Sequence, residues 1–493
     1  MKNHLPLLLV CCLSIFLSCK DDPIPNPLPE NPSVETPTTG SPDTSFAVDI
    51  GTSTIPYIII DTKGTSIENE PKVAADMTIF VEQEAIQQAQ IGIEFRGSTS
   101  FRLSQKKSYG IEVWDEAGND LATSFFGFPA EEDWVLIGHI VDPDRNFILD
   151  QTLMYHHFGY ELFRAMGRYA SRSKYVELEI NGDYQGVYMF MEKLKRDKER
   201  IAIEKLAATD TDSTSITGGY ILKIDKTAGG DLKLNQPLAY FESNWEDDAR
   251  YQSDFSFRSA YDINGNTLTF DPYAAPYHNL QFLETYFIYE YPKADNITAD
   301  QKTYIQDYIH DFETALLTDD FSSNNRTYTD YIDLGSFVDY FIINEVCRNV
   351  DGYRLSTYLH KDKNDKLNMG PIWDLNIGYD TGDRVPFDGW VANYNTYVDQ
   401  DPWMVPFWWP RLLQDPVFKT ALKTRWQELR TAELQTAVLL SKVDEVATYL
   451  QSNGAIDRNY AKWGAVNYTE SVNSLKAYLE NRIAWMDGQI DGF

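Results

Sequence analysis

Hydrophobic and polar positions alternate with a period of two along much of the first half of the chain, a pattern typical of half-buried β-strands. The clearest alternating runs are residues 57–60, 77–81, 91–95, 107–113, 133–137, 175–180, 186–192 and 219–225. Asn181 and Gly182 separate two of these runs, and Asn-Gly between alternating segments is a strong signal for a tight hairpin. The first half therefore predicts a structure rich in strands.

The second half has a different pattern, in which apolar residues recur every three or four positions, as they do along one face of a helix. The helices expected from this spacing are residues 298–318, 334–348, 410–452 with a break, and 468–488, together with an earlier one at 145–166. A strand at 356–360 and a polar turn at 362–366 interrupt the helical half. We predict an α+β fold with a strand-rich N-terminal half and a helical C-terminal half.

The start of the chain predicts export and a lipid anchor. Residues 7–16 are an apolar run of about ten residues, which suits a signal peptide and is too short to span a bilayer. The run closes on Ser18 and Cys19, which fits the cleavage box of bacterial lipoproteins, where the cysteine is acylated. We predict a signal peptide at 1–18 and lipidation of Cys19; the alternative is an ordinary signal peptide with a chance cysteine.

Residues 20–22, a lysine and two aspartates, resemble the surface-export signal of Bacteroidetes lipoproteins, and a plain polar spacer is the alternative. We therefore expect an outer-membrane lipoprotein exposed on the cell surface. Residues 19–45 would carry the lipid and form a proline-rich, disordered stalk, because such a composition cannot bury apolar surface.

The composition restricts the possible partners. The net charge of −31 disfavours nucleic acid as a partner, because an acidic surface repels phosphate backbones. It also disfavours a basic patch as membrane anchor, so the lipid is the only membrane contact that we expect. Cys11 and Cys12 leave with the signal peptide and Cys19 takes the lipid, so Cys347 stands alone and no disulfide is expected. Apolar residues make up 43% of the chain, enough for a sizeable core.

Two acidic motifs in the second half are candidates for chemistry. Asp351 follows the helix expected at 334–348, and Asp374 follows the polar turn and strand after it. A hairpin between the two acids would bring both carboxylates to one end of a sheet. Two carboxylates and the amide of Asn376, without histidine or cysteine, suit a hard cation such as Mg²⁺. Alternatively, each aspartate caps a turn.

A third candidate is the loop formed by Arg96, Gly97 and Ser98 between two predicted strands. A loop of small residues exposes backbone N–H groups that bind phosphate, and Lys106 and Lys107 add positive charge where the next strand begins. The alternative is an ordinary surface hairpin.

Taken together, these motifs resemble the CotH family of secreted, spore-coat-protein-H-like kinases. The motifs that carry the resemblance occur in family order at residues 95–100, 106–109, 133–136, 145–146, 181–188, 192, 218–222, 349–351, 370–374 and 406–412. The match spans about residues 55–430. We therefore expect a kinase-like domain at 46–430, with an N-terminal β segment at 46–90, and a helical extension at 431–493.

The resemblance implies an atypical protein-kinase-like fold that binds ATP and Mg²⁺ or Mn²⁺ and phosphorylates Ser or Thr of envelope or extracellular proteins. Asp351 would occupy the catalytic-loop position as base or metal ligand. Asp374 would stand where ordinary kinases place the metal-binding Asp of their DFG motif, with Asn376 as a further ligand. Lys107, or Lys106 beside it, would bind phosphate, and Glu192 would be a partner or hinge residue.

Several positions depart from the kinase pattern. Ser356 stands where a kinase catalytic loop has a metal-binding Asn, and Leu375 and Asn376 replace the Phe and Gly of the DFG motif. A catalytically degenerate kinase fold that serves as a binding or scaffold lipoprotein is therefore an alternative. A surface glycan-binding lipoprotein is another, suggested by four aromatic residues that could stack on sugars or pack in the core: Trp403, Phe407, Trp408 and Trp409.

Overall fold

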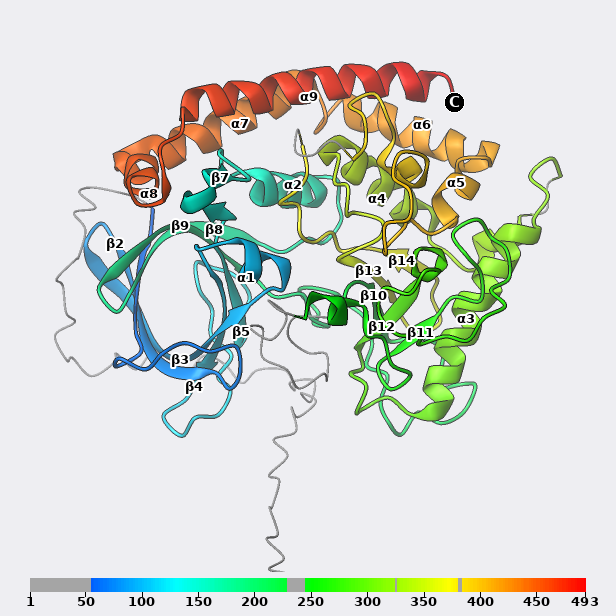
Figure 1. The fold of residues 1–493 in the computed structure, drawn as a ribbon, viewed down its shortest axis with the longest axis horizontal. Coiled ribbons are helices and arrows are strands. Elements are labelled where there is room, and N and C mark those ends of the chain that lie inside the picture. The colour runs from blue at the N-terminus through cyan, green and yellow to red at the C-terminus, as the bar shows by residue number, and fades with distance from the viewer. Residues whose placement is uncertain (1–54, 228–243, 324–325, 380–383) are drawn as a thin grey trace, which may run out of the picture. The chain divides into compact units, whose positions relative to one another are not determined.

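The computed structural model is an α+β structure, as the sequence predicts, and its strands lie mainly in the first half of the chain (Figure 1). It describes residues 55–227, 244–323, 326–379 and 384–493. The predicted signal peptide, Cys19 and the stalk lie outside these residues. No helix in the described ranges is both long and apolar enough to cross a membrane.

The first half forms a closed barrel with the strand order β1-β2-β3-β4-β5-β9-β8. Its strands are β1 (Tyr57–Asp61), β2 (Val73–Val81), β3 (Glu84–Arg96), β4 (Ser108–Trp114), β5 (Asp133–Ile137), β8 (Ser173–Ile180) and β9 (Asp183–Glu192). The barrel closes where β1 pairs in parallel with β8, with Tyr57 opposite Glu177. Every other residue of these strands points inward, and the resulting core contains Ile58, Ile91, Ile111, Leu136, Leu178 and Phe190.

The hairpin between β8 and β9 has the turn that the sequence predicts. Asn181 and Gly182 both adopt positive φ angles, 52° and 79°, as the two-residue turn between twisted strands requires. The amide of Asn181 also binds Thr62 at the end of β1, through Oδ1 to the backbone N–H and Nδ2 to the hydroxyl. The turn residue therefore helps to close the barrel.

The helix predicted at 145–166 is wrong in its first half. Short elements fill this region: β6 (Val141–Asp142), η1 (Pro143–Arg145) and β7 (Phe147–Ile148), and only then α2 (Tyr155–Ala165). The carboxylate of Asp150 accepts the backbone N–H groups of Thr152 and Tyr155. This local capping holds residues 150–154 in a turn and delays the helix to Tyr155.

A second sheet lies beside the barrel, with the strand order β11-β12-β10-β13-β14 (Figure 1). Its strands are β10 (Tyr220–Ile224), β11 (Ser256–Arg258), β12 (Tyr286–Tyr291), β13 (Thr357–Lys361) and β14 (Leu367–Met369). The hairpin of β13 and β14 is the one expected between the two candidate aspartates. Strands β11 and β12 were not predicted. Single-turn helices accompany the sheet: η3 (Trp245–Ala249), η4 (Gln281–Leu283) and η5 (Thr327–Asp330).

The longer helices include α3 (Ala299–Thr318), α4 (Leu334–Cys347), α5 (Trp408–Leu412), α6 (Pro416–Arg430), α7 (Thr436–Gln451), α8 (Ala455–Trp463) and α9 (Tyr468–Asp491). The single-turn helices η6 (Val391–Thr396) and η7 (Ser452–Gly454) lie between them. The helix expected at 410–452 with one break is interrupted twice: at 413–415, where the Asp415 carboxylate caps Val417 and Pro416 begins α6, and at 431–435 between α6 and α7. Helix α8 was not predicted.

The C-terminal helices pack against both halves of the structure (Figure 1). Helix α8 contacts β9 of the barrel, and Arg458 pairs with the fully buried Glu177 of β8 at 2.6 Å. Helix α9 contacts α4, where the guanidinium of Arg482 and the carboxylate of Glu345 pair at 2.9 Å with both side chains fully buried. Residues 431–493 thus share one compact unit, Thr44–Phe493, with the rest of the fold.

Candidate active-site cleft

A cleft of about 560 Å³ opens between the barrel and the second sheet. The barrel contributes the end of β3, the turn at Gly97 and Ser98, and the short helix α1 (Thr99–Leu103) that follows where the sequence predicted only a loop. The second sheet contributes residues of β10, β12 and β13. The loops after α4 and after β14 complete the lining. The volume lies within the usual range of small-molecule sites. Among the predicted site residues, those that line this cleft are Arg96, Gly97, Ser98, Asp351, Asp374 and Asn376.

Asp351 enters the cleft from the loop after α4. Arg348 ends that helix in the left-handed conformation, with φ of 47°, and turns the chain toward the cleft. The carboxylate Oδ1 of Asp351 accepts a hydrogen bond from Nη2 of Arg354 at 2.5 Å and lies 3.8 Å from Nη1 of Arg384. The Asp351 side chain keeps 23% of its surface exposed. It is thus a carboxylate already flanked by two guanidinium groups.

Asp374 enters the cleft from the loop after β14 and is the more open of the two acids, with 43% of its side chain exposed. Its backbone is in the left-handed region, with φ of 54°, a conformation that non-glycine residues adopt mostly at functional or tightly constrained sites. Two residues of helix α2 contact it. The backbone N–H of Asp374 donates to the hydroxyl of Tyr160 at 3.2 Å, and its Oδ1 lies 3.4 Å from Nε2 of His156.

The barrel reaches Asp374 through the loop after β3. The guanidinium of Arg96 lies over the ring of Trp373, 5.6 Å from its centroid, so the loop contacts the residue just before Asp374. Gly97 has φ of 85°, and a Cβ there would lie 2.2 Å from Oγ of Ser100, so the turn requires glycine. The hydroxyl of Ser98 is buried and has no hydrogen-bond partner among the described residues.

Lys106, Lys107 and Glu192 lie outside the cleft lining. The Lys106 ammonium is buried and donates to the carbonyl of Val187 at 2.6 Å and to Oδ1 of Asn459 at 2.8 Å, and burial lowers its pKa well below the usual value. The ammonium of Lys107 donates to the carbonyl of Phe101. Both lysines therefore hold structure together at these contacts rather than face the cleft.

Glu192 is fully buried and pairs with two arginines. Its Oε1 accepts from Nη1 of Arg172 at 2.5 Å and lies 3.4 Å from Nε of Arg200, and its Oε2 accepts the backbone N–H of Arg172 at 2.9 Å. It therefore ties the end of β9 to the chain on either side of the β8–β9 hairpin.

The basic side chains that line the cleft are Arg96, which the sequence analysis named, and six others that it did not. Seven basic and seven acidic residues contribute to the lining, whereas the whole chain has 43 basic and 74 acidic residues. The basic set is Lys72, Arg96, Lys193, Lys223, Lys226, Arg354 and Arg384. The cleft is thus balanced in charge on a strongly acidic protein, which makes it a favourable place for an anionic ligand.

Lys223 is the most central of these cations by its position in the sheet. It lies opposite Tyr358 of β13, and its ammonium is 3.6 Å from Glu290 and 3.7 Å from Asp225. Lys226, just beyond β10, donates to Oγ1 of Thr99 at 3.3 Å, which links the second sheet to the barrel loop. Lys223 lies in β10 and Asp225 directly follows the strand, two residues later. Residues two apart in an extended chain point to the same side, and this spacing could have identified the pair from the sequence.

Asp225 adds a third carboxylate near Asp374. Burial raises the pKa of Asp225, Lys223 opposes the rise, and the negative charge of Asp374 adds to it. Backbone N–H groups of Lys226 and Ser356 also lower this pKa by hydrogen bonding. The two acids are therefore close enough to repel one another, an arrangement that favours a bound cation between or beside them.

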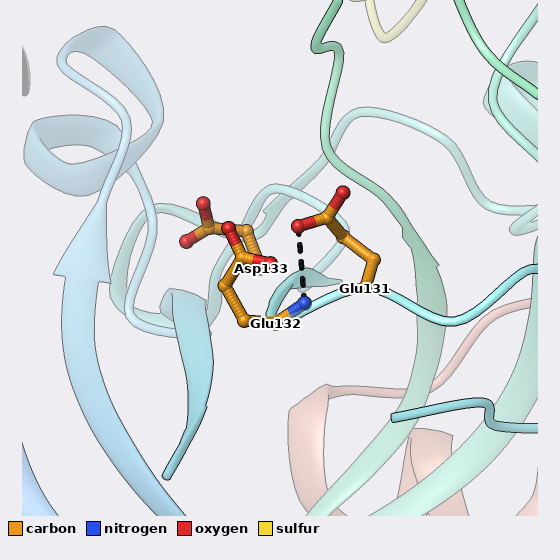
Figure 2. Close-up of side chains that lie close together, drawn as sticks. All are labelled: Glu131, Glu132 and Asp133. Atoms are coloured by element: carbon orange, nitrogen blue, oxygen red, sulfur yellow. Dashed lines mark hydrogen bonds between the residues drawn. The ribbon is translucent and has the colours of Figure 1, made fainter. Parts of the chain in front are cut away.

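One tight acidic cluster lies elsewhere, where Glu131, Glu132 and Asp133 place carboxylate oxygens within 4.8 Å of one another (Figure 2). The ammonium of Lys195 contacts all three, at 2.9, 2.5 and 3.1 Å. Burial raises the pKa of Glu132 to about 7, and a side-chain hydrogen bond to the Glu131 carboxylate adds to the rise. Lys195 thus already pairs with all three carboxylates, and Arg200 pairs with Glu131 as well, so we interpret the cluster as an ion-pair network of the barrel.

This α+β fold, with two acids that flank a β-hairpin and line a cleft balanced in charge, is that of a kinase-like protein. The family model described as CotH kinase protein matches residues 93–486, which is most of the chain. The chain belongs to that family, as its motifs predict, and the match extends through α8 and into α9. Among curated proteins, none matches this chain.

Proposed function

We propose that this protein is a kinase that binds ATP with a divalent cation in the cleft and transfers the γ-phosphoryl group to Ser or Thr of a protein. The observation that carries the proposal is the convergence of Asp351 and Asp374 on a cleft with as many basic as acidic side chains. Phosphoryl transfer asks mainly for positioning and neutralisation of charge, and these groups supply both.

The donor set fits a divalent cation, because carboxylate and amide oxygens of Asp351, Asp374 and Asn376 are ligands of the type that Mg²⁺ and Mn²⁺ accept. Such an ion would neutralise phosphate charge. Lys223 and Lys226, which line the cleft, would bind phosphate oxygens, in the role that the sequence analysis gave to Lys107 or Lys106.

In the transfer, a bond would form between the acceptor hydroxyl oxygen and the γ-phosphorus while the bond to the β-phosphate oxygen breaks and ADP leaves. Asp351 is placed to take the hydroxyl proton, and Arg354 and Arg384 beside it would stabilise charge on the transferred group. The apolar part of the lining could hold the base and ribose: Phe95, Leu103, Ile140, Phe147 and Leu149.

Incubation of the purified chain with γ-labelled ATP and Mg²⁺ or Mn²⁺, followed by mass spectrometry of the chain and a generic protein acceptor, tests this proposal. We expect phosphoserine or phosphothreonine. A scaffold that binds nucleotide without transfer is the second candidate, favoured by the pairing of Asp351 with Arg354 and by Ser356 in place of Asn. That candidate predicts a thermal shift with ATP and no labelled product.

Three of the four aromatic residues that suggested glycan binding pack in the core. Phe407, Trp408 and Trp409 are 5%, 1% and 1% exposed. Trp408 donates from Nε1 to the buried Glu313 at 2.9 Å. Trp403 lines the cleft, where its ring lies 4.8 Å from the ammonium of Lys226. Burial therefore favours packing over sugar stacking, and we do not propose glycan binding.

We also propose that the kinase is exported and anchored in the outer membrane through acylated Cys19, with a protein of the envelope or the exterior as its acceptor. The support is the apolar run at 7–16 that ends in Ser18 and Cys19. Labelled palmitate should be incorporated into the chain and lost in Cys19→Ser, while Cys12→Ser should still be labelled. Equal labelling of the Cys19→Ser variant would overturn the anchor.

A further inference from the structure

The side chain of His156, in the first turn of α2, is an unusual neighbour for a metal-binding carboxylate. It is 5% exposed, and its Nδ1 has no hydrogen-bond partner in the described part of the chain. Its Nε2 lies 3.4 Å from Oδ1 of Asp374, beyond the usual N–H···O hydrogen-bond distance. Buried polar groups are nearly always paired, and because no protein hydrogen bond holds this ring through Nδ1, Nε2 is the nitrogen that remains to fix its position beside Asp374.

The spacing of the two atoms fits ligands that share one metal ion. Two ligand atoms about 2.1 Å from an ion, at right angles to one another, lie about 3.0 Å apart. The pair of Nε2 and Oδ1 would have to close by only a few tenths of an ångström. A pocket of about 40 Å³ adjoins the cleft at this point, and it is lined by His156, Asp374 and Asn376 among others. That volume is enough for a single ion or water.

We propose that His156 is a ligand of the divalent cation at Asp374 and that its imidazole makes the site select Mn²⁺ over Mg²⁺. The inference rests on the proposed kinase function, whose metal site it specifies. Mg²⁺ binds oxygen ligands and gives up water reluctantly, whereas imidazole nitrogen suits transition-metal ions. One nitrogen beside the carboxylate and amide oxygens therefore shifts the preference toward Mn²⁺.

The neighbouring His157 provides a matched control. It lies on the same helix, but its Nδ1 is hydrogen-bonded to Oγ of Ser173 at 2.8 Å, and it is not part of the cleft lining. Burial lowers its pKa to about 4, with nearby Arg164 and Lys174 adding to the effect. Its replacement removes an imidazole from α2 without touching Asp374.

The test measures Mn²⁺ binding to the full chain, without nucleotide, by electron paramagnetic resonance. Mg²⁺ binding to the same chain is measured by calorimetry. In the wild type and in His157→Gln, we expect the electron spin echo of Mn²⁺ to be modulated by the nitrogen of a directly bound imidazole. This nitrogen modulation should be lost in His156→Gln. His156→Gln should weaken Mn²⁺ binding by roughly tenfold or more, while Mg²⁺ affinity changes far less.

Bound Mn²⁺ without nitrogen modulation in the wild type would overturn the inference, and this readout needs no variant to fold. If Asp374→Asn abolished this Mn²⁺ binding, the metal site of the proposed kinase would be supported, and only the role of His156 as a ligand would be contradicted. Mn²⁺ binding that survives in Asp374→Asn, with or without ATP, would instead remove the metal assignment itself, and the inference with it.

Discussion

The guanidinium of Arg354 donates from Nη2 to Oδ1 of Asp351 at 2.5 Å, so the first of the two acids in the cleft is held by an arginine three residues later. Arg354 is 1% exposed and also binds Asp401 at 3.1 Å and the carbonyl of Trp403 at 2.8 Å. This network fixes Asp351 in place and brings positive charge to the point where phosphoryl transfer would occur.

Replacing Arg354 by Met should lower the free energy of unfolding by about 3 kcal/mol, because it leaves Asp351 and Asp401 without their buried partner. Urea unfolding measures the change. Arg384→Met is the control: its guanidinium is 51% exposed and 3.8 Å from Asp351, so the stability should change by less than about 0.5 kcal/mol. Equal losses in the two variants would contradict the network.

Lys223→Met should weaken ATP binding by about tenfold or more, because a charge-assisted bond to phosphate is worth about 1.5–3 kcal/mol. Calorimetric titration with ATP measures the affinity. Lys107→Met should leave it within about twofold, since Lys107 is not among the residues that line the cleft and its ammonium donates to the carbonyl of Phe101. The reverse order would restore the assignment that the sequence suggested.

Stability should fall as the pH rises because of Glu313. Burial raises its pKa from the usual 4.5 to about 7, although Ser259 and Trp408 hydrogen-bond to it and oppose the rise. Between these values the folded state keeps a proton that the unfolded state releases, so the stability present below pH 4.5 is lost as the pH rises through 7.

Glu313→Gln removes this titration. The difference in unfolding free energy between pH 4 and pH 8 should become smaller by up to about 3 kcal/mol. Glu428→Gln, at a side chain that is 66% exposed, should leave the difference as it is in the wild type. An unchanged pH dependence in Glu313→Gln would show that this carboxyl does not hold its proton on folding.

Lys195→Met should convert the acidic cluster of the barrel into a cation site. Without the ammonium, the carboxylates of Glu131, Glu132 and Asp133 repel one another, so the melting temperature should fall and millimolar Ca²⁺ should partly restore it. Lys193→Met removes a contact of 3.7 Å to Asp133 and should gain no Ca²⁺ response. A Ca²⁺ response of the wild type would contradict this interpretation.

Local pattern was enough to predict much of the fold. Alternation located the barrel strands, and Asn181 with Gly182 located one turn. The closure of the barrel was not predictable, because β1 meets β8 across more than a hundred residues and no local period reports that pairing. The helix predicted at 145–166 began too early because apolar spacing does not show that the Asp150 carboxylate caps a turn.

In the site, too, local features were predictable from the sequence and contacts between distant parts of the chain were not. The hairpin between Asp351 and Asp374 was predictable, and the structure brings both acids to one cleft. The choice of a phosphate-binding lysine was not predictable in the same way. The ammonium of Lys107 donates to the carbonyl of Phe101, and that of Lys106 donates to Asn459 of α8, a residue distant in sequence. His156 and Tyr160 contact Asp374 from positions four apart on α2. The sequence did not predict these contacts, because a spacing of four is common to every buried helix face.

The most direct test of the account is phosphate transfer from γ-labelled ATP by the full chain, measured beside Asp374→Asn and Asp388→Asn. Asp388 is an exposed acid outside the cleft lining and serves as the matched control. We expect the wild type and Asp388→Asn to transfer phosphate and Asp374→Asn to lose roughly a hundredfold or more of the rate. Equal transfer by a folded Asp374→Asn variant would contradict it.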